Sequence, residues 1–237
     1  MKILVLNGSP RPNGNTSAMV EAFTEGAKEN GHQVDVVNVC QKKIAGCLAC
    51  EYCHEKDSGH ERQCVQQDDM QEIYEKIKAS DIIIESFPLY FFGMPSVMKC
   101  LTDRCLPFML PYMGNQTGDG SSFHELRDEN MHNKKLVLIS TCGYVETKSM
   151  YPALLKQYDL ICGENCYTSI ICPEGELFIA EKAKRQRESY LRDVKEAGKE
   201  FSEKNCISEK TMSKISIPIL SPKGFEAITL AHWNQDI

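Results

Sequence analysis

The chain begins with an apolar run, Lys2-Ile-Leu-Val-Leu-Asn7, that leads directly into the polar segment Gly8-Ser-Pro-Arg-Pro-Asn-Gly-Asn-Thr-Ser17. A short continuous run of Ile, Leu and Val that ends at Gly-Ser-Pro is typical of a buried strand. A helix is expected next, over residues 15–30, because apolar residues recur there at three- and four-residue steps and Gly31 is a stop signal. The N-terminus therefore predicts a strand, a polar loop and a helix.

The same alternation continues along the chain. Strands are predicted at residues 2–7, 33–39, 81–87, 135–141 and 166–172, and helices at 15–30, 68–79, 95–105, 149–161 and 176–203. The strands are continuous apolar runs, as expected when helices cover both faces of a sheet. This pattern predicts a doubly wound, five-stranded parallel α/β sheet. Residues 1–203 are expected to form one domain, and 204–237 an irregular extension that packs on it or on a partner subunit.

Composition excludes several classes of protein. The 237 residues are 42% apolar and 25% charged, which is ordinary for a globular protein. No apolar run approaches the length of a membrane span. The net charge of −6 argues against nucleic acid as the main partner. The first apolar run is too short for a signal peptide, so we expect a cytoplasmic protein whose twelve cysteines stay reduced.

A doubly wound sheet binds its ligands at the carboxyl ends of the strands. The chemistry is therefore expected in residues 8–17, 88–94 and 141–147. The first of these loops opens a helix, where backbone N–H groups favour an anion. It lacks both the Gly-Lys-Ser/Thr of a P-loop and the Gly-x-Gly-x-x-Gly of a dinucleotide site. Many neutral donors with one cation, Arg11, suit a single phosphate monoester such as that of FMN; the alternative is a simple helix cap.

The other two loops contain aromatic residues. The second reads Pro88-Leu89-Tyr90-Phe91-Phe92-Gly93-Met94-Pro95, and the third reads Thr141-Cys142-Gly143-Tyr144. Three consecutive aromatic residues after a central strand are poorly placed for a core and would suit a flat apolar ring, with Gly93 allowing close backbone approach. The alternative is that these side chains are core residues beneath a loop.

Four linked motifs resemble the NADPH-dependent FMN reductase family. They are Gly8-Ser9-Pro10-Arg11-x-x-Gly14-Asn15-Thr16, Asp68-Asp69-Met70, Pro88-x-Tyr90-x-x-Gly93-Met94-Pro95 and Lys99-x-x-x-Asp103-Arg104. The resemblance implies a flavodoxin-like fold with sheet order 2-1-3-4-5, bound FMN, and a homodimer or homotetramer. It implies that the phosphate is held by Ser9, Arg11, Asn15, Thr16 and Ser17. It also implies that the flavin ring is flanked by Pro88, Leu89, Tyr90, Phe91, Phe92, Gly93, Cys142, Gly143 and Tyr144. Asp103 and Arg104 are interpreted as a structural ion pair.

A cluster of cysteines follows the second predicted strand. Cys47-x-x-Cys50-x-x-Cys53, followed by Cys64, resembles the motif of the iron–sulfur flavoprotein branch, in which thiolates converge on a [4Fe–4S] cluster. The gap of ten residues before Cys64 is longer than that branch usually has. His54 and His60 lie in this gap and would allow a zinc site instead. The third alternative is that the cysteines bind no metal.

Three hypotheses for function follow. The first is an FMN-dependent oxidoreductase that passes hydride or electrons from NADH or NADPH to a small acceptor such as a quinone, a nitro compound, free flavin or a metal. In this hypothesis flavin N5 carries the chemistry, no side chain acts as acid or base, and residues 106–134 shape the acceptor pocket. The second is an iron–sulfur electron carrier that receives electrons from a ferredoxin-like donor without nicotinamide. The third is a non-catalytic flavodoxin-like module.

Overall fold

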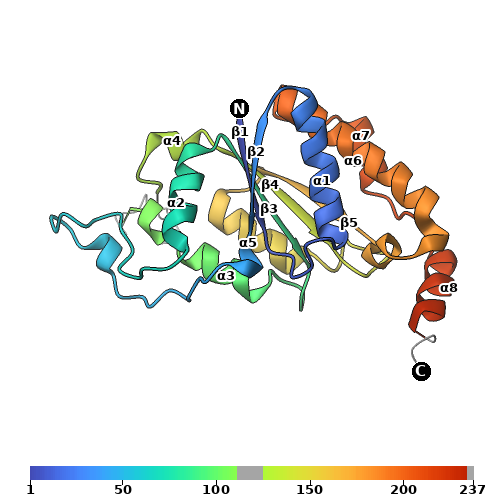
Figure 1. Cartoon of the computed structure of the whole chain (residues 1–237), viewed down its shortest axis with the longest axis horizontal. Coiled ribbons are helices and arrows are strands. Elements are labelled where there is room, and N and C mark those ends of the chain that lie inside the picture. The colour runs from blue at the N-terminus through green and yellow to red at the C-terminus, as the bar shows by residue number, and fades with distance from the viewer. Residues whose placement is uncertain (111–124, 234–237) are drawn as a thin grey trace, which may run out of the picture.

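The central element is a parallel five-stranded sheet (Figure 1). The computed structural model describes residues 1–110 and 125–233. The strands are β1 (Lys2–Asn7), β2 (Gln33–Asn38), β3 (Ile82–Pro88), β4 (Lys135–Thr141) and β5 (Tyr167–Cys172), in the order β2-β1-β3-β4-β5. All neighbouring strands pair in parallel. The doubly wound class and the predicted strand order are both confirmed.

Helices cover both faces of the sheet (Figure 1). One face packs against α1 (Asn15–Glu29) and α6 (Lys184–Lys204), and the other against α2 (Met70–Ala79), α3 (Ser96–Asp103) and α5 (Pro152–Cys162). Each face therefore buries its own apolar cluster, which explains why the central strands read as continuous apolar runs. The chain runs in one direction along every strand, so all the strand-to-helix loops emerge at one edge of the sheet.

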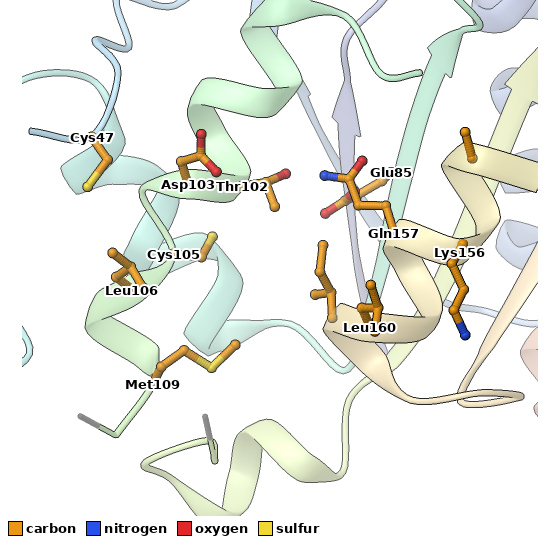
Figure 2. Close-up of a pocket in the computed structure, with 12 residues that line it drawn as sticks. Cys47, Glu85, Thr102, Asp103, Cys105, Leu106, Met109, Lys156, Gln157 and Leu160 are labelled. Atoms are coloured by element: carbon orange, nitrogen blue, oxygen red, sulfur yellow. The ribbon is translucent and has the colours of Figure 1, made fainter. Parts of the chain in front are cut away.

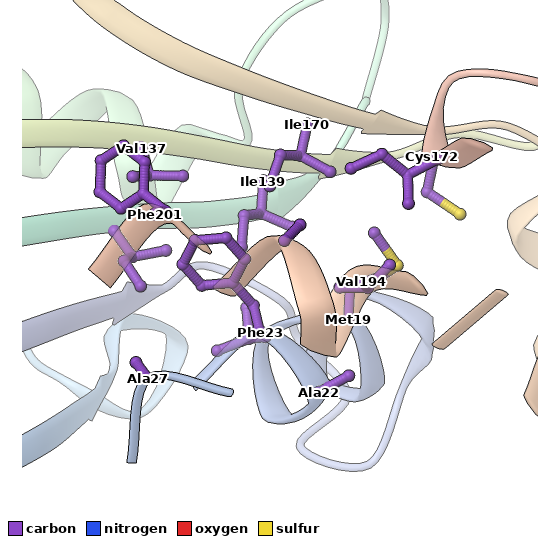
Figure 3. Packing of buried hydrophobic residues seen from close by; sticks show 14 of the residues in the cluster. Met19, Ala22, Phe23, Ala27, Val137, Ile139, Ile170, Cys172, Val194 and Phe201 are labelled. Atoms are coloured by element: carbon purple, nitrogen blue, oxygen red, sulfur yellow. The ribbon is translucent and has the colours of Figure 1, made fainter. Parts of the chain in front are cut away.

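The core beneath α1 and α6 is compactly filled (Figure 3). Phe23 of α1 and Phe201 of α6 lie with ring centroids 6.0 Å apart, in the same apolar cluster as Val137 and Ile139 of the sheet. This packing holds α1 against the sheet, and α1 begins at the first of the three loops.

Helix α6 begins later than expected, at Lys184 rather than at residue 176. Two 3₁₀ turns, Gly175–Phe178 and Glu181–Ala183, occupy the intervening residues. Glu174 has a left-handed backbone with φ of 54°, and the next amide, Gly175 N–H, donates to the Cys142 carbonyl at 2.7 Å. These contacts hold the chain against the loop after β4, so the continuous helix starts only beyond them.

The C-terminal extension is less irregular than the sequence suggests. It contains α7 (Glu209–Ile215) and α8 (Pro222–Trp233). Ser208 caps α7 by accepting a hydrogen bond from Thr211 N–H at 3.2 Å. Ile215 is buried in the same core as α1 and α6, and its carbonyl accepts a hydrogen bond from the Tyr190 hydroxyl at 2.8 Å. The division of the chain after residue 203 remains a prediction.

Two long loops leave the sheet. Residues 40–67 extend away from the body of the molecule (Figure 1); they begin within the 3₁₀ turn Val39–Gln41 and contain the 3₁₀ turn Tyr52–His54. The segment predicted as an acceptor loop, 106–134, contains the 3₁₀ turn Leu106–Phe108 and α4 (Glu129–His132), and residues 111–124 within it lie outside the described part. None of the helices formed by residues 1–110 and 125–233 has the length and apolar character needed to cross a membrane.

Candidate functional site

The three predicted loops meet at the carboxyl edge of the sheet. Gly8 N–H donates to the Ser86 carbonyl at 2.7 Å, which joins the first loop to the end of β3. Leu89 N–H donates to the Thr141 carbonyl at 2.8 Å, which joins the second loop to the third. The hydroxyls of Thr16 and Thr141 hydrogen-bond at 2.8 Å, which joins the start of α1 to the third loop. The loops therefore form one surface, as parallel topology requires.

The first loop presents an uncapped helix N-terminus. Gly14 occupies the N-cap of α1, no side chain caps the helix, and the first turn contains no acidic residue. The hydroxyls of Ser9 and Ser17 donate to the Arg11 carbonyl at 3.1 and 3.3 Å, which curls the loop around the helix end. The Arg11 side chain is exposed and forms no ion pair within the described residues. The structure thus brings the five predicted phosphate residues together, with Thr16 already committed to Thr141.

Asn7 organises this loop, and the sequence analysis missed it. It is buried at the end of β1, and its side-chain oxygen accepts a hydrogen bond from Ser9 N–H at 3.0 Å. Its amide nitrogen donates to the Ser17 hydroxyl at 3.1 Å. One side chain therefore ties both ends of the loop to the strand. The signal in the sequence was a polar residue that closes an apolar strand directly before Gly-Ser-Pro.

The second loop is a tight hairpin with an unusual backbone. Tyr90 and Gly93 exchange two backbone hydrogen bonds, of 3.1 and 3.0 Å, and the two residues between them have positive φ. Phe91 has φ of 46° and Phe92 of 62°, a conformation that normally requires Asn or Gly. Phe91 is 101% exposed and Phe92 is 49% exposed. A strained turn that presents two phenyl rings to solvent is expected at a binding site rather than in a core.

The third loop lies beside the second. The rings of Tyr144 and Phe92 stack, with centroids 6.3 Å apart and planes inclined by 19°. Cys142 is buried instead, and burial raises the pKa of its thiol. A Cβ on Gly175 would lie 3.2 Å from the Cys142 carbonyl and 3.4 Å from the Asn15 amide nitrogen. The turn at Glu174 and Gly175 therefore supports both the first and the third loop, a contact that sequence analysis did not anticipate.

The four predicted cysteine ligands line one cavity. This four-cysteine cavity, lined among others by Cys47, Cys50, Cys53 and Cys64, has a volume of about 20 Å³, room for about one water. Burial raises the pKa of Cys53, and the charges of the other three thiolates raise it further. As the side chains stand, no three Cys, His, Asp or Glu residues of the described ranges form a group that could hold a metal ion. Cys47 and Cys50 are exposed, whereas Cys53 and Cys64 are half-buried.

The backbone of the cysteine loop is also strained. Ala49 and Glu51, which lie between the first three cysteines, have φ of 49° and 57°. Ala49 N–H points back and donates to the Cys47 sulfur at 3.4 Å. Left-handed non-glycine residues are costly and gather at binding sites. Backbone N–H groups directed at cysteine sulfur are an arrangement that stabilises thiolates.

The two histidines in this loop are engaged elsewhere. His54 Nε2 hydrogen-bonds the Leu106 carbonyl at 3.2 Å, and its Nδ1 lies 3.3 Å from a Glu51 oxygen. His60 stacks on Tyr52 with ring centroids 3.7 Å apart, and its Nδ1 hydrogen-bonds the Tyr52 carbonyl at 3.2 Å. Neither ring takes part in a metal-binding group within the described residues. The structure therefore does not favour the alternative of a zinc site with histidine ligands.

Residues 1–149 match the family described as NADPH-dependent FMN reductase. The chain belongs to this family. One relative of this FMN reductase family member is an iron–sulfur flavoprotein from Methanosarcina thermophila. The two sequences are 41% identical over 104 residues, which cover 44% of this chain and 52% of the relative. The chain spans about half the length of several such relatives. Another, an iron–sulfur flavoprotein from Archaeoglobus fulgidus, is 33% identical over 69% of this chain and 77% of its own length.

Solved structures share the fold of this family member. The NAD(P)H:quinone oxidoreductase from Methanothermobacter marburgensis superposes with a TM-score of 0.60 at 18% identity, over 85% of this chain and 96% of that one. At this identity the likeness establishes the flavodoxin-like fold and nothing finer.

The residues around the first loop fit the phosphate of FMN. An uncapped α1 N-terminus supplies backbone donors, and exposed Arg11 supplies a positive charge within the same loop. The exposed rings of Phe91, Phe92 and Tyr144 provide apolar surface beside it.

The lining of the four-cysteine cavity fits an iron–sulfur cluster in its chemistry, because it combines four thiols with a guanidinium. Arg104 lines the cavity and is 1% exposed, and its buried Nε atom has no hydrogen-bond partner within the described part of the chain. Arg104 forms an ion pair with Asp68, whereas Asp103 pairs with Lys99. Asp103 and Arg104 thus both form ion pairs, although not with each other as the sequence suggested.

A larger cavity, of about 780 Å³, adjoins the four-cysteine cavity and shares Cys47 with it. Figure 2 shows Thr102 and Asp103 of α3 on one side and Gln157 and Leu160 of α5 on the other. Glu85 of β3 also lines it, accepts a hydrogen bond from the Tyr158 hydroxyl and has a pKa raised by burial. None of the described residues that line it belongs to the three loops. This cavity is therefore separate from the candidate flavin site.

Proposed function

We propose that the protein is an FMN-dependent oxidoreductase that transfers hydride or electrons from NADH or NADPH to a small acceptor. The observation that carries this proposal is the meeting of an uncapped helix N-terminus with a strained, exposed aromatic hairpin at one edge of the sheet. The first suits a phosphate and the second a flat ring, and FMN carries both groups. Membership of the FMN reductase family supports the same assignment.

The chain would bind FMN through hydrogen bonds and charge, and its side chains would not take part in the chemical step. In this proposal Ser9, Asn15, Ser17 and the N–H groups that open α1 donate to the phosphate, while Arg11 neutralises part of its charge. Thr16 contributes its backbone, because its hydroxyl already bonds Thr141. Bound FMN would supply two-electron acceptance with release of electrons singly or in pairs. No acid or base is required from the side chains, and the aromatic residues exclude water from one side of the ring.

The test is an anaerobic titration of the purified yellow protein. Stoichiometric NADPH or NADH should bleach the visible flavin band, and a quinone or a nitro compound should restore it. An Arg11→Met variant should retain the fold and bind FMN about ten- to a hundredfold more weakly, since a charge-assisted hydrogen bond contributes about 1.5–3 kcal/mol. A holoprotein that neither nicotinamide bleaches would contradict the enzymatic proposal.

A second function is favoured by the four-cysteine cavity. We propose that Cys47, Cys50, Cys53 and Cys64 hold a [4Fe–4S] cluster, so that the protein can also carry electrons for a ferredoxin-like donor without nicotinamide. Four thiols around one cavity and a buried donor support this assignment, as do relatives named iron–sulfur flavoproteins. A cluster is a one-electron centre, so it would permit electrons to pass singly to or from the flavin.

Iron and sulfide analysis after anaerobic reconstitution tests this second function. Near four irons per chain are expected, and Cys53→Ser should abolish most of them. Cys206→Ser is the matched control, because Cys206 is an exposed thiol that follows α6. Less than one iron per wild-type chain would reject the cluster and leave the FMN proposal standing.

We further propose that the protein assembles as a homodimer or homotetramer, in keeping with its family resemblance. Light scattering at several protein concentrations measures the mass directly, and a value near 26.8 kDa at all concentrations would contradict the proposal.

A further inference from the structure

Arg104 is the most deeply buried cation beside the four-cysteine cavity. Its side chain is 1% exposed, and it lines the cavity together with the four thiols. Burial alone would lower the pKa of its guanidinium, but the hydrogen bond to Asp68 and the negative charge of the Cys64 thiolate raise it. A guanidinium remains charged in proteins in any case. A fixed positive charge therefore stands next to a set of groups that carry negative charge when they bind metal.

The orientation of Arg104 is set by a closed set of hydrogen bonds. Its two Nη atoms donate to the two oxygens of Asp68 at 2.8 and 3.0 Å. Nη1 also donates to the Ala45 carbonyl at 2.9 Å, and Ala45 N–H donates to Asp68 at 3.1 Å. The ion pair thus grips the backbone at both polar groups of Ala45, two residues before Cys47. Asp68 also accepts Met70 N–H at 3.1 Å, which ties the pair to the start of α2.

In this arrangement both Nη atoms of Arg104 donate hydrogen bonds, and Nε is the one remaining donor atom of the guanidinium. The Nε atom is buried and has no hydrogen-bond partner among residues 1–110 and 125–233. A buried donor without an acceptor costs free energy, and a charged donor costs more. The unpaired Nε–H of Arg104 therefore indicates a missing acceptor. The acceptors that the cavity would gain with a cluster are sulfur atoms, and hydrogen bonds to cluster sulfur raise the reduction potential by favouring the more negative, reduced state.

We infer that Arg104 is a positioning residue that raises the reduction potential of a cluster bound at Cys47, Cys50, Cys53 and Cys64, through its buried charge and its uncommitted Nε–H donor. Asp68 opposes this effect, because it places a negative charge in the same pair. This inference rests on the iron–sulfur part of the proposed function.

The opposed charges of the pair provide a decisive test. Arg104→Met and Asp68→Asn both loosen the grip on Ala45, so a purely structural role predicts that they shift the cluster potential in the same direction. An electrostatic role predicts opposite shifts, down for Arg104→Met and up for Asp68→Asn. Arg104→Lys keeps the charge but lacks Nε, and should lie between wild type and Arg104→Met. Arg62→Met is the control, since Arg62 is an exposed cation of the same loop, paired with Asp128.

The measurement is a redox titration of the reconstituted holoprotein followed by electron paramagnetic resonance, with iron content and circular dichroism recorded for each variant. The flavin in the same sample serves as an internal reference whose potential should not change. Arg104→Met is expected to lower the ratio of reduced to oxidised cluster at least tenfold at fixed potential, about 59 mV for a one-electron couple. Arg62→Met should leave the ratio unchanged.

Each other outcome has a definite meaning. Wild-type protein without iron overturns the iron–sulfur proposal and this inference together. Iron-loaded variants at the wild-type potential, or variants of Arg104 and Asp68 that shift in the same direction, overturn the inference alone. If Arg104→Met does not fold, Arg104→Lys and Asp68→Asn take its place in the test. The inference then requires that these two variants shift the cluster potential in opposite directions.

Discussion

At the scale of single residues, the aromatic hairpin exposes two phenyl rings at the cost of a strained backbone. Phe91 and Phe92 occupy the two central positions of a two-residue turn with positive φ, where Asn-Gly is the favoured pair. Bulky residues in this conformation are strained, and the dipeptide sequence Phe-Phe does not indicate that the backbone adopts it. The sequence correctly marked these aromatics as unsuited to a core, but the turn that exposes them depends on the bonds between Tyr90 and Gly93.

We expect that replacing Phe91 and Phe92 with Asn and Gly stabilises the apoprotein and weakens flavin binding. Relief of the strained backbone should raise the free energy of unfolding by about 1–3 kcal/mol. Loss of ring contacts should weaken FMN binding about tenfold, since an aromatic pair contributes about 0.5–1.5 kcal/mol beyond its buried area. Urea denaturation and flavin-fluorescence titration measure the two effects.

The control for this prediction is Asn205→Gly. Asn205 also has positive φ, 56°, but it ends α6, in an element outside the three loops. It should gain stability without changing flavin affinity. A Phe-to-Asn-Gly variant that binds FMN as tightly as wild type would remove the hairpin from the site.

At the scale of elements, α1 and α6 approach each other through glycine. A Cβ on Gly198 of α6 would lie 1.9 Å from the Phe23 carbonyl of α1, and a Cβ on Gly26 of α1 would lie 2.0 Å from the Lys195 carbonyl of α6. Each glycine therefore admits the backbone of the other helix. This contact fixes where α1 lies, and with it the N-terminus that faces the first loop.

We predict that Gly198→Ala destabilises the protein by about 2–3 kcal/mol, because a backbone carbonyl cannot move aside as a flexible side chain can. Gly46→Ala should change the free energy of unfolding by less than about 0.5 kcal/mol, because a Cβ there meets nothing within 4 Å. Chemical denaturation of both variants checks the prediction. Equal stabilities would show that the helices can separate at little cost.

Glu174 connects two further elements, the end of β5 and the C-terminal extension. Its carboxylate is fully buried, one oxygen accepts Leu220 N–H at 2.8 Å, and the other has no partner among the described residues. Burial raises the pKa of this carboxyl above its usual 4.5, although hydrogen bonds from the tail backbone lower it in part. The folded protein therefore binds this proton more tightly than the unfolded chain does.

The sign of the linkage follows from this shift. The stabilisation from protonated Glu174 is fully present below pH 4.5 and is lost as pH rises through the raised folded pKa. Glu174→Gln keeps an acceptor for Leu220 and removes the charge, so it should be more stable than wild type at pH 8, by about 1 kcal/mol. The advantage should vanish near pH 4. Urea titrations across this pH range provide the measurement.

Glu200→Gln should behave in the opposite way. Burial raises the pKa of Glu200, but hydrogen bonds from Ser208 and Thr211 outweigh it and hold that pKa below 4.5. This variant should lose stability above pH 4.5 and match wild type in acid. The same slope in both variants would contradict our account of Glu174.

At the scale of the whole molecule, the extension divides into a packed part and a peripheral part. Ile215 of α7 is buried in the core shared with α1 and α6, whereas α8 protrudes from the body of the molecule (Figure 1). Truncation after Lys204 should therefore cost at least about 2 kcal/mol, the value of one fully buried aliphatic side chain.

Truncation after Ser221 removes only α8 and the residues beyond it, and should cost less than about 1 kcal/mol. Thermal unfolding of the two truncated chains beside the full chain compares them. If both truncations are neutral, the packing of α7 contributes nothing to folding; if both are severe, α8 is part of the domain.

The amino-acid sequence was enough to predict the parallel sheet, the edge at which the loops meet and the residue types that gather there. These follow from local pattern: apolar runs, helix signals and the rule that parallel strands end at one edge. With the family resemblance, the strand order and the cofactor class could also be stated.

How those residues are held depends on contacts that form only in the folded chain. Asn7 reaches across its loop, Arg104 pairs with Asp68 across 36 positions, and Glu174 receives a hydrogen bond from a residue 46 positions away. Periodicity within a window of a dozen residues carries no information about such partners. Burial then leaves Arg104 Nε and one Glu174 oxygen without partners, and a buried polar atom is costly only once the whole chain has closed around it.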